Sequence, residues 1–243
     1  QLLHEQLGIG SLAELEDACR AGRVRTVKGL GPKTEENILR GIDRLRRHSE
    51  RVPLGVALPV ARSIAEEMAA LPFVERAAYA GSVRRGRETI GDVDIIASSQ
   101  AAEDVVRKFV ALPGVQQVLA QGKEKASVVL AQGLQVDLLV VRDEQFAAAL
   151  HHFTGSKEHN IALRELARAK KLRISEHGIV DEATGNTRPV HAEADVFAAV
   201  GLPFIPPELR EDGSEIAAAR AGTLPNLIEL TDVRGDLHVH STW

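Results

Sequence analysis

Two aspartates one residue apart, preceded by a turn rich in glycine and arginine, are the part of this chain best equipped for chemistry. The turn reads Gly81-Ser82-Val83-Arg84-Arg85-Gly86, and the acidic segment reads Gly91-Asp92-Val93-Asp94-Ile95-Ile96. Residues i and i+2 of a strand point to the same face, so Asp92 and Asp94 are predicted to project together. Two carboxylates this close repel each other unless a cation lies between them, and hard oxygen ligands suit Mg²⁺ or Mn²⁺. The backbone N–H groups of the Gly-Ser turn and the guanidinium groups of Arg84 and Arg85 are suited to holding phosphates. The pattern therefore predicts a metal-dependent nucleotidyl-transfer site.

Asp137 is the best candidate for the third carboxylate that a two-metal reaction of this kind needs. It lies in an almost wholly apolar segment, Leu134-Gln135-Val136-Asp137-Leu138-Leu139-Val140-Val141. A lone charge in such a strand is costly unless it is paired or binds a metal. The two metals of such a site lie about 3.5–4 Å apart, which places the acids on neighbouring strands. The alternative, a surface-facing residue on an alternating strand, remains open.

Composition and charge limit the possible classes of function. The chain has 243 residues, a net charge of −4 and one cysteine, Cys19. The single cysteine excludes an internal disulfide framework and fits a reducing cytosol, and no apolar run reaches the ~18 residues that a membrane span needs. A membrane partner is therefore not expected, and the expected location is cytoplasmic, at the nucleoid. Basic residues crowd the run 157–173, and the acidic excess lies mainly after Glu176. That run is either a nucleic-acid channel in an acidic body or a solvated helix face.

Residues 1–52 are predicted to form a helical DNA-binding subdomain. Ser11 precedes a helix over 12–21, and Glu14 three residues later completes a capping-box pattern. A second helix, over 35–47, follows the turn Gly29-Leu30-Gly31-Pro32-Lys33-Thr34. A Gly-x-Gly turn at a helix start exposes backbone N–H groups to an anion, so this turn resembles the helix-hairpin-helix element that grips a DNA phosphate without reading sequence. The candidate DNA contacts are Gly29, Gly31, Lys33 and Thr34. The alternative is a plain tight turn between packed helices.

Residues 53–143 are predicted to form a small mixed sheet backed by helices, the catalytic palm of an α+β fold. The apolar pattern predicts helices over 58–71 and 102–112. It predicts strands over 74–80, 92–98, 115–120, 126–131 and 134–141, with a hairpin turn at Gln132-Gly133.

Residues 144–222 are predicted to form a helical-plus-hairpin subdomain that binds nucleotide and template. A helix over 147–152 ends at Thr154-Gly155-Ser156, and Ser156 is the expected N-cap of a helix that runs to Lys171. Strands over 173–181 and 187–190 are expected to pair as a hairpin around Gly185-Asn186. Residues 223–243 are predicted to be a linker and the first strand of a truncated domain, so the chain is expected to be a fragment of a longer enzyme.

Four ordered motifs make the chain similar to the family X DNA polymerases, and in particular to bacterial members that carry a C-terminal PHP domain. The motifs are Gly81-Ser82-x-Arg84-Arg85-Gly86, Gly91-Asp92-x-Asp94, Asp137 on a later strand, and Phe153-Thr154-Gly155-Ser156. The resemblance covers essentially the whole chain. It implies that Asp92, Asp94 and Asp137 bind two metal ions, Mg²⁺ or Mn²⁺, and that Asp137 acts as the base or base-proxy for the primer 3′-hydroxyl.

The resemblance also implies how the nucleotide and the DNA are held. Ser82 and Arg85 would hold the triphosphate, and Gly91 would add a backbone contact. His152 and Phe153 lie where the family places Tyr-Phe near the nucleotide sugar. Asn160 falls where an asparagine reaches the minor-groove edge of the incoming base, and Arg164 where an arginine contacts the template strand. The full nucleotide-binding set is Gly81, Ser82, Arg85, Gly91, His152, Phe153, Gly155, Lys157 and Asn160.

Several departures from the family pattern bear on function. His152 replaces a tyrosine, which leaves discrimination between deoxy- and ribonucleotides open. Lys157 replaces an aspartate that packs on the base and could instead contact a phosphate. Leu139 stands where an arginine pairs with a metal-binding aspartate, so that control of the site is absent or different. The N-terminal lyase domain of the family is missing, so removal of a 5′-deoxyribose phosphate is not expected.

The segment Asp236-Leu237-His238-Val239-His240 resembles the opening of a PHP metal site. Strand alternation would place His238 and His240 on one face. The remaining ligands would lie beyond Trp243, so neither exonuclease nor phosphatase activity is expected from this truncated site.

The sequence therefore predicts a DNA-directed DNA polymerase that adds dNMP to a primer 3′-hydroxyl, with short-gap filling in DNA repair as its role. Its partners would be primed or gapped duplex DNA and a dNTP, and the chain would act as a monomer. Two alternatives remain. One is a template-independent or small-molecule nucleotidyltransferase with the same aspartates, and the other is a non-catalytic DNA-binding scaffold.

Overall fold

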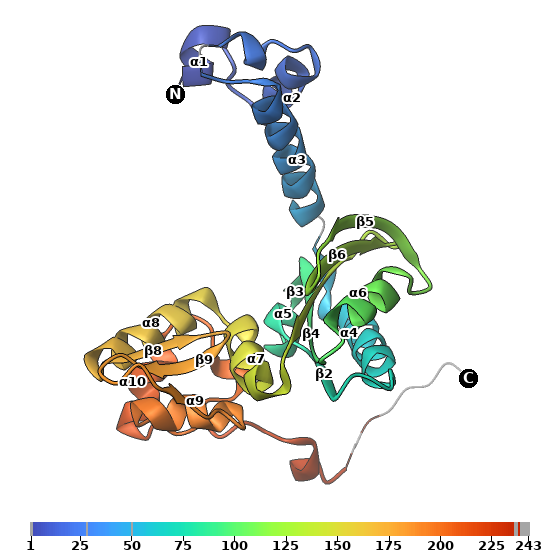
Figure 1. Cartoon of the computed structure of the whole chain (residues 1–243). Helices are drawn as coiled ribbons and strands as arrows, with labels where there is room; N and C mark the ends of the chain where they lie inside the picture. The colour runs from blue at the N-terminus through green and yellow to red at the C-terminus, as the bar shows by residue number, and fades with distance from the viewer. Residues whose placement is uncertain (1, 28, 50, 236–237, 239–243) are drawn as a thin grey trace. The chain divides into compact units, whose positions relative to one another are not determined.

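The computed structural model describes residues 2–27, 29–49, 51–235 and 238. The chain divides into two compact units, Gln1–Phe146 and Ala147–Trp243 (Figure 1). Among the described residues, no helix is both long enough and apolar enough to cross a membrane.

The first unit begins with a small helical group that has its own core. Its elements are α1 (Leu2–Leu7), α2 (Leu12–Arg20), the 3₁₀ turn η1 (Val24–Thr26) and α3 (Pro32–Ser49). The predicted capping box is present, because the Glu14 N–H donates to Ser11 Oγ at 3.2 Å and Glu14 Oε2 accepts from the Ser11 N–H at 3.2 Å. Ala18, Cys19 and Val24 form the buried centre of this group. The lone cysteine is thus a core residue, and its burial raises the pKa of its thiol.

A five-stranded mixed sheet follows, in the strand order β2-β4-β7-β6-β5. Its strands are β2 (Arg76–Tyr79), β4 (Asp92–Ser98), β5 (Val115–Gln121), β6 (Lys125–Leu130) and β7 (Gln135–Val141). The pairs β2–β4, β6–β7 and β5–β6 are antiparallel, whereas β4 and β7 run parallel. A separate small pair joins β1 (Val52–Pro53) to β3 (Thr89–Ile90). The helices of this part of the first unit are α4 (Leu54–Ala69), α5 (Gly81–Arg84) and α6 (Ala102–Val110).

The sheet packs an apolar face on the helices, and on its other face the starts of β4 and β7 carry polar side chains. Helix α4 packs on β2 and β4, and α6 packs on β6 and β7 (Figure 1). The alternate residues Val93 and Ile95 of β4 and Val136 of β7 are fully buried in the core that includes Phe109 of α6. Because strand side chains alternate between faces, Asp92, Asp94 and Asp137 lie on the face turned away from that core.

The second unit packs helices around a small three-stranded sheet. Its elements are α7 (Phe146–Thr154), α8 (Lys157–Ala169), β8 (Leu172–Ser175), β9 (Gly178–Asp181), β10 (Thr187–Arg188), α9 (Glu193–Val200) and α10 (Ser214–Ala221). The 3₁₀ turn η2 (Asp143–Gln145) ends the first unit, and the second unit also contains the 3₁₀ turns η3 (Pro207–Leu209) and η4 (Leu230–Asp232), the latter in an exposed segment. Leu163, Leu172 and Phe197 lie in its apolar core.

Three local expectations are corrected. Helix α4 begins at Leu54 rather than near residue 58, with Pro59 inside its second turn. The Gly-Ser turn is a single turn of helix, α5. The expected single strand over 173–181 is two antiparallel strands, because the chain reverses at Glu176-His177, with Ser175 paired to Gly178. Positive φ at Gly178 (127°) supports that reversal, which an apolar pattern does not reveal.

Candidate active site

Three carboxylates share one face of the five-stranded sheet. In the parallel pairing of β4 with β7, Asp94 lies directly opposite Asp137, and Asp92 lies two residues before Asp94 on the same face. All three side chains are partly exposed, whereas their strand neighbours Val93 and Val136 are fully buried. The pairing of β4 with β7 therefore brings Asp137 to Asp92 and Asp94, as the sequence predicted, although Asp137 lies more than 40 positions further along the chain.

Gly81, at the start of α5, lies against the Asp94 carboxylate. Its φ is +63°, and a Cβ placed on it would lie 2.1 Å from Asp94 Oδ2. The N–H of Ala80 also donates to the Asp94 carbonyl at 2.8 Å, which ties the start of α5 to β4. Position 81 therefore requires glycine for two reasons: its backbone is left-handed, and the Asp94 carboxylate occupies the space that a side chain would need.

The electrostatics of the cluster are those of crowded like charges. The pKa of Asp94 is raised to about 7, first by burial and then by the negative charges of Asp92 and Asp137, while the positive charge of Arg85 opposes the rise. A cation among these oxygens would relieve the repulsion.

Gln135 is a participant that sequence reasoning missed. Its Nε2 donates to both oxygens of Asp137, at 3.1 and 3.0 Å, and its Cα pairs with that of Asp92 across β4–β7. These two hydrogen bonds fix the orientation of the Asp137 carboxylate. The available signal was its position two residues before Asp137 on the same strand face.

The donor set suits a hard divalent cation, because it consists of carboxylate oxygens on a solvent-accessible face of a sheet. Among the described residues, however, no three His, Cys, Asp or Glu side chains are already grouped closely enough to hold a metal ion. Asp137 is held by Gln135 instead, and mutual repulsion opposes closer approach of the acids.

The phosphate-binding candidates surround this cluster. Ser82 lies in α5, and Arg85 is the first residue after that helix; both are partly buried. Gly91 is buried immediately before β4, and a Cβ there would lie 3.3 Å from a terminal nitrogen of Arg51. Arg51 itself donates from Nε to Thr89 Oγ1 at 2.9 Å. Arg51 thus lies against the residue that precedes β4, a contact that sequence reasoning did not predict.

In the second unit, the nucleotide candidates gather where α7 ends and α8 begins. The rings of His152 and Phe153 lie 5.2 Å apart, and Asn160 Nδ2 donates to the His152 carbonyl at 2.8 Å. Arg164 is exposed and donates from Nε to the Asn160 carbonyl at 2.9 Å. Lys157 is exposed in the first turn of α8.

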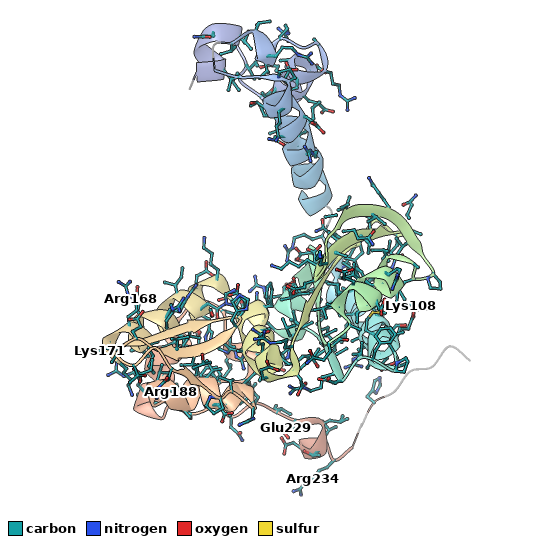
Figure 2. All side chains as sticks on the ribbon, in the orientation of Figure 1. Lys108, Arg168, Lys171, Arg188, Glu229 and Arg234 are labelled. Atoms are coloured by element: carbon teal, nitrogen blue, oxygen red, sulfur yellow. The ribbon has the colours of Figure 1, made fainter. Side chains whose placement is uncertain are left out.

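The turn between these helices is buried and tightly bonded. Gly155 has φ +68°, and Ser156 is the N-cap of α8, its Oγ accepting from the His159 N–H at 3.1 Å. The predicted cap is therefore confirmed. The basic residues after it are exposed: Figure 2 shows Arg168 and Lys171 extending outward near the end of α8, with Arg188 in the same unit.

The helix-hairpin-helix candidates lie in one turn. Gly29 (φ +91°) and Lys33 are exposed, and Gly31 and Thr34 are half-buried. The Gly31 N–H donates to Thr34 Oγ1 at 3.4 Å, and the Thr34 N–H donates to the Gly31 carbonyl at 2.9 Å. The turn is anchored from behind by buried Glu35, which accepts from the backbone N–H and Nε of Arg25 at 2.7 and 2.5 Å.

The PHP candidates fall at the limit of the described chain. His238 lies outside regular structure and is exposed. Asp236 and His240 lie outside the described residues, so the predicted Asp-x-His-x-His strand stays a prediction.

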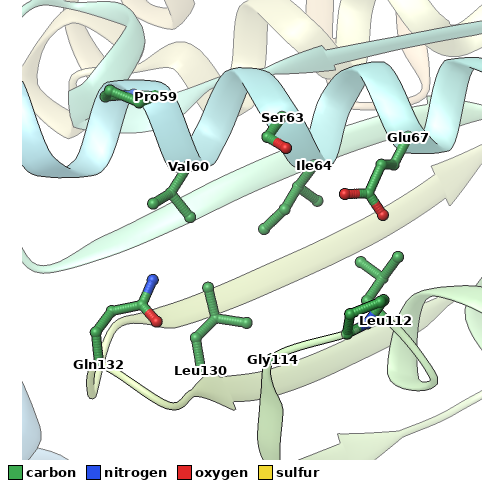
Figure 3. A pocket seen from close by; sticks show the side chains of 10 residues that line it. Pro59, Val60, Ser63, Ile64, Glu67, Leu112, Gly114, Leu130 and Gln132 are labelled. Carbon is green, nitrogen blue, oxygen red and sulfur yellow. The ribbon is translucent and has the colours of Figure 1, made fainter.

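A pocket of about 330 Å³ lies elsewhere on the first unit and does not include the aspartates. Figure 3 shows Val60, Ile64 and Glu67 of α4 pointing across it toward Leu112 and Leu130. Most of its lining residues are exposed, which makes it a shallow depression rather than an enclosed site.

Comparisons with known proteins agree with this architecture. Residues 149–211 match the family model of the DNA polymerase beta thumb, and residues 1–44 match that of the SAM-like helix-hairpin-helix tandem. The chain is 40% identical, over 99% of its length, to the DNA polymerase/3′-5′ exonuclease PolX of Bacillus subtilis (strain 168). It is 30% identical to DNA polymerase lambda of Rattus norvegicus over 54% of its length. The chain spans 42% and 28% of the lengths of these two relatives.

Solved structures give the same fold. A ternary primer/template complex of Leishmania infantum polymerase beta superposes with a TM-score of 0.67 at 23% identity. The match covers 86% of this chain and 91% of that one. The chain therefore has a polymerase beta-like fold, with a mixed sheet that carries three acids in one unit and a match to the polymerase beta thumb in the other. The chain belongs to the family X DNA polymerases. Members of this family generally depend on divalent metal ions.

Proposed function

We propose that this chain is the polymerase portion of a family X enzyme, which adds dNMP to the 3′-hydroxyl of a primer opposite a template base. The observation that carries the proposal is the placement of Asp94 opposite Asp137, with Asp92 on the same face and Gly81 closed against Asp94. The two relatives from Bacillus subtilis and Rattus norvegicus are named as DNA polymerases, and the structural neighbours are complexes with primer and template or with gapped DNA. Short gaps in duplex DNA are the proposed substrate.

Two Mg²⁺ or Mn²⁺ ions bound by the three aspartates would neutralise charge on the triphosphate and lower the pKa of the attacking hydroxyl. The chain's own residues supply the rest. Gln135 orients the Asp137 carboxylate, the proposed acceptor of the proton of the primer hydroxyl. Arg85 and Ser82 bind the triphosphate, and Arg85 offsets the charge that develops on it.

The proposal assigns the remaining contacts to three places. Asn160, His152 and Phe153 contact the base and sugar of the nucleotide, with Gly155 and Lys157 beside them. Arg164 contacts the template strand. The turn over 29–34 holds a DNA phosphate without reading sequence, because it lies at the N-terminus of α3 and carries the exposed Lys33. The proposed working state is a monomer.

The direct test is extension of a primer on a one-nucleotide-gapped duplex, with each dNTP singly and with Mg²⁺ or Mn²⁺. Wild type should insert only the matched nucleotide, and Asp137→Asn should lose at least about a hundredfold in rate. Asp104→Ala is the matched control, since Asp104 is a partly exposed aspartate of α6 paired with Arg107. Equal activity of wild type and Asp137→Asn would refute the assignment of the site.

A second candidate function has one observation in its favour. Over 31% of its length, the chain is 30% identical to the DNA nucleotidylexotransferase of Xenopus laevis. Incorporation that ignores the template base in the same assay would favour a template-independent transferase. Binding of gapped DNA without any incorporation would favour a scaffold.

A further inference from the structure

Residues 210–215 of the second unit form a segment that contacts the start of α8. It is held in place by Arg210, whose side chain is fully buried. The guanidinium donates from one terminal nitrogen to Glu193 Oε1 at 2.8 Å and from Nε to the Ile205 carbonyl at 2.8 Å. It also lies 5.0 Å from the ring centroid of Phe197. A charge buried this completely, with its partner on α9, fixes the segment to the core of the unit.

From this anchor, the backbone of the segment reaches the N-cap of α8. The Arg210 carbonyl accepts from the Ser156 N–H at 3.1 Å, and the Glu211 carbonyl accepts from Ser156 Oγ. The same Oγ accepts from the His159 N–H, so one hydroxyl joins the segment to the helix start. The N-cap residue of α8 is therefore also held by a segment more than 50 residues further along the chain.

Two further residues of the segment, Gly213 and Glu215, contact α8 just after its N-cap. Gly213, at φ +87°, approaches so closely that a Cβ there would lie 3.3 Å from Ala162 Cβ and 3.5 Å from the Glu158 carbonyl. Glu215 Oε1 lies 2.6 Å from His159 Nδ1, with the histidine fully buried and the glutamate nearly so. The rings of His151 and Phe197 pack around that histidine.

We propose that residues 210–215 act as a clamp on the first turn of α8, and that this clamp positions Asn160 and so sets the affinity for the incoming nucleotide. Asn160 directly follows the clamped His159, and its amide is already tied to the His152 carbonyl. The nucleotide part of this inference rests on the proposed function. The clamp itself does not, because it concerns contacts within the second unit. Glu215, His159 and Arg210 are positioning residues that act through the backbone of α8.

The test compares Gly213→Ala with Gly222→Ala. The two glycines flank α10 at its two ends, and both have left-handed backbones (φ +87° and +68°). Alanine is strained at both, but only at position 213 does the new methyl press on α8, since nothing lies within 4 Å of position 222. The control thus carries a comparable backbone cost without the push.

The first readout is backbone hydrogen exchange, which needs no catalysis. Residues 157–162 should exchange about tenfold faster in Gly213→Ala than in Gly222→Ala, because local opening of the helix start becomes easier. Equal exchange of this stretch in both variants would overturn the clamp, whether or not the chain polymerises.

The second readout is kinetic. On the gapped duplex, Gly213→Ala should raise KM for the matched dNTP about tenfold with a smaller change in kcat, because the catalytic aspartates are untouched. An equal KM in both variants, despite faster exchange in Gly213→Ala, would overturn the link from the clamp to nucleotide affinity. If wild type itself shows no incorporation, the proposed function fails, and the exchange result still decides the clamp.

A third variant pair tests Glu215. Glu215→Gln keeps an acceptor for the His159 ring and should retain wild-type KM within about twofold, whereas Glu215→Ala leaves that buried ring without this partner and should behave like Gly213→Ala. Equal defects in the glutamine and alanine variants would show that the clamp does not act through the hydrogen bond to His159.

Discussion

Replacement of Gly81 by alanine should inactivate the site while leaving the fold almost intact. The added methyl would lie 2.1 Å from Asp94 Oδ2, against 3.4 Å or more for an ordinary contact. Either the carboxylate or the start of α5 must therefore move by about 1 Å, and a displacement of that size costs on the order of a hundredfold in rate. In free energy this is about 2.7 kcal/mol of lost transition-state stabilisation.

The variant also carries a backbone cost that must be separated from the effect on the site. Alanine at a left-handed position costs about 1–2 kcal/mol, which lowers stability without touching chemistry. Gly114 is the matched control. It has φ +89° in the same unit, and nothing lies within 4 Å of its added Cβ. It precedes β5, which is separated from β7 by β6.

The assay is single-turnover insertion of a matched dNTP into a one-nucleotide gap, beside urea unfolding of each variant. We expect both variants to lose about 1–2 kcal/mol of unfolding free energy, and only Gly81→Ala to lose about a hundredfold in insertion rate. Insertion by Gly81→Ala at the rate of Gly114→Ala would refute the reasoning, because it would show that the position of the Asp94 carboxylate does not limit the reaction.

Three further predictions concern residues around the site and the turn. Gln135→Leu removes the donor that orients the Asp137 carboxylate and should reduce Mn²⁺ affinity about 10- to 100-fold by calorimetry; an unchanged affinity would contradict that role. Burial works to raise the pKa of Asp143, but hydrogen bonds from Arg76 and Ser98 and the Arg76 charge outweigh it and hold the pKa below its ordinary 3.8. The stabilisation of the folded state by ionised Asp143 is therefore complete above about pH 4 and is lost as pH falls through the lowered pKa. Arg76→Met should consequently destabilise the protein above about pH 4, and the part of this destabilisation that depends on ionised Asp143 should disappear at lower pH. That part should be about 1 kcal/mol or less, because both side chains are more than a third exposed, and a pH-independent difference in urea unfolding would contradict it. Glu35→Gln should weaken the anchor behind the 29–34 turn and so reduce affinity for gapped DNA in a fluorescence anisotropy titration, with insertion at saturating DNA unchanged; a lower insertion rate at saturation would contradict this.

The sequence alone determined what depends on short-range periodicity and on residue type. The alternation around Asp92 and Asp94 placed both on one strand face, and β4 spans the predicted residues 92–98. Ser11 and Ser156 were identified as helix caps because a capping signal occupies only a few consecutive residues. The ordered motifs also indicated the family, and the similarity of the whole chain to a bacterial relative supports that assignment.

Other features required the tertiary structure, because they join residues that no local pattern connects. Parallel pairing of β4 with β7 decides that Asp137 faces Asp94, and a one-residue slip would have turned it into the core. The fit of Gly81 to Asp94 and the approach of Arg51 to Gly91 likewise arise only when the chain folds.

The second unit shows the same division. Sequence pattern located α8 but merged β8 and β9 into one strand, since a two-residue reversal leaves the apolar pattern almost continuous. Nothing in the pattern singled out Arg210 or Glu215 from the surface charges nearby. Only folding of α9 and α10 against α8 buries them, and burial is what turns an ordinary charge into a fixed support, because an unpaired charge is not tolerated there.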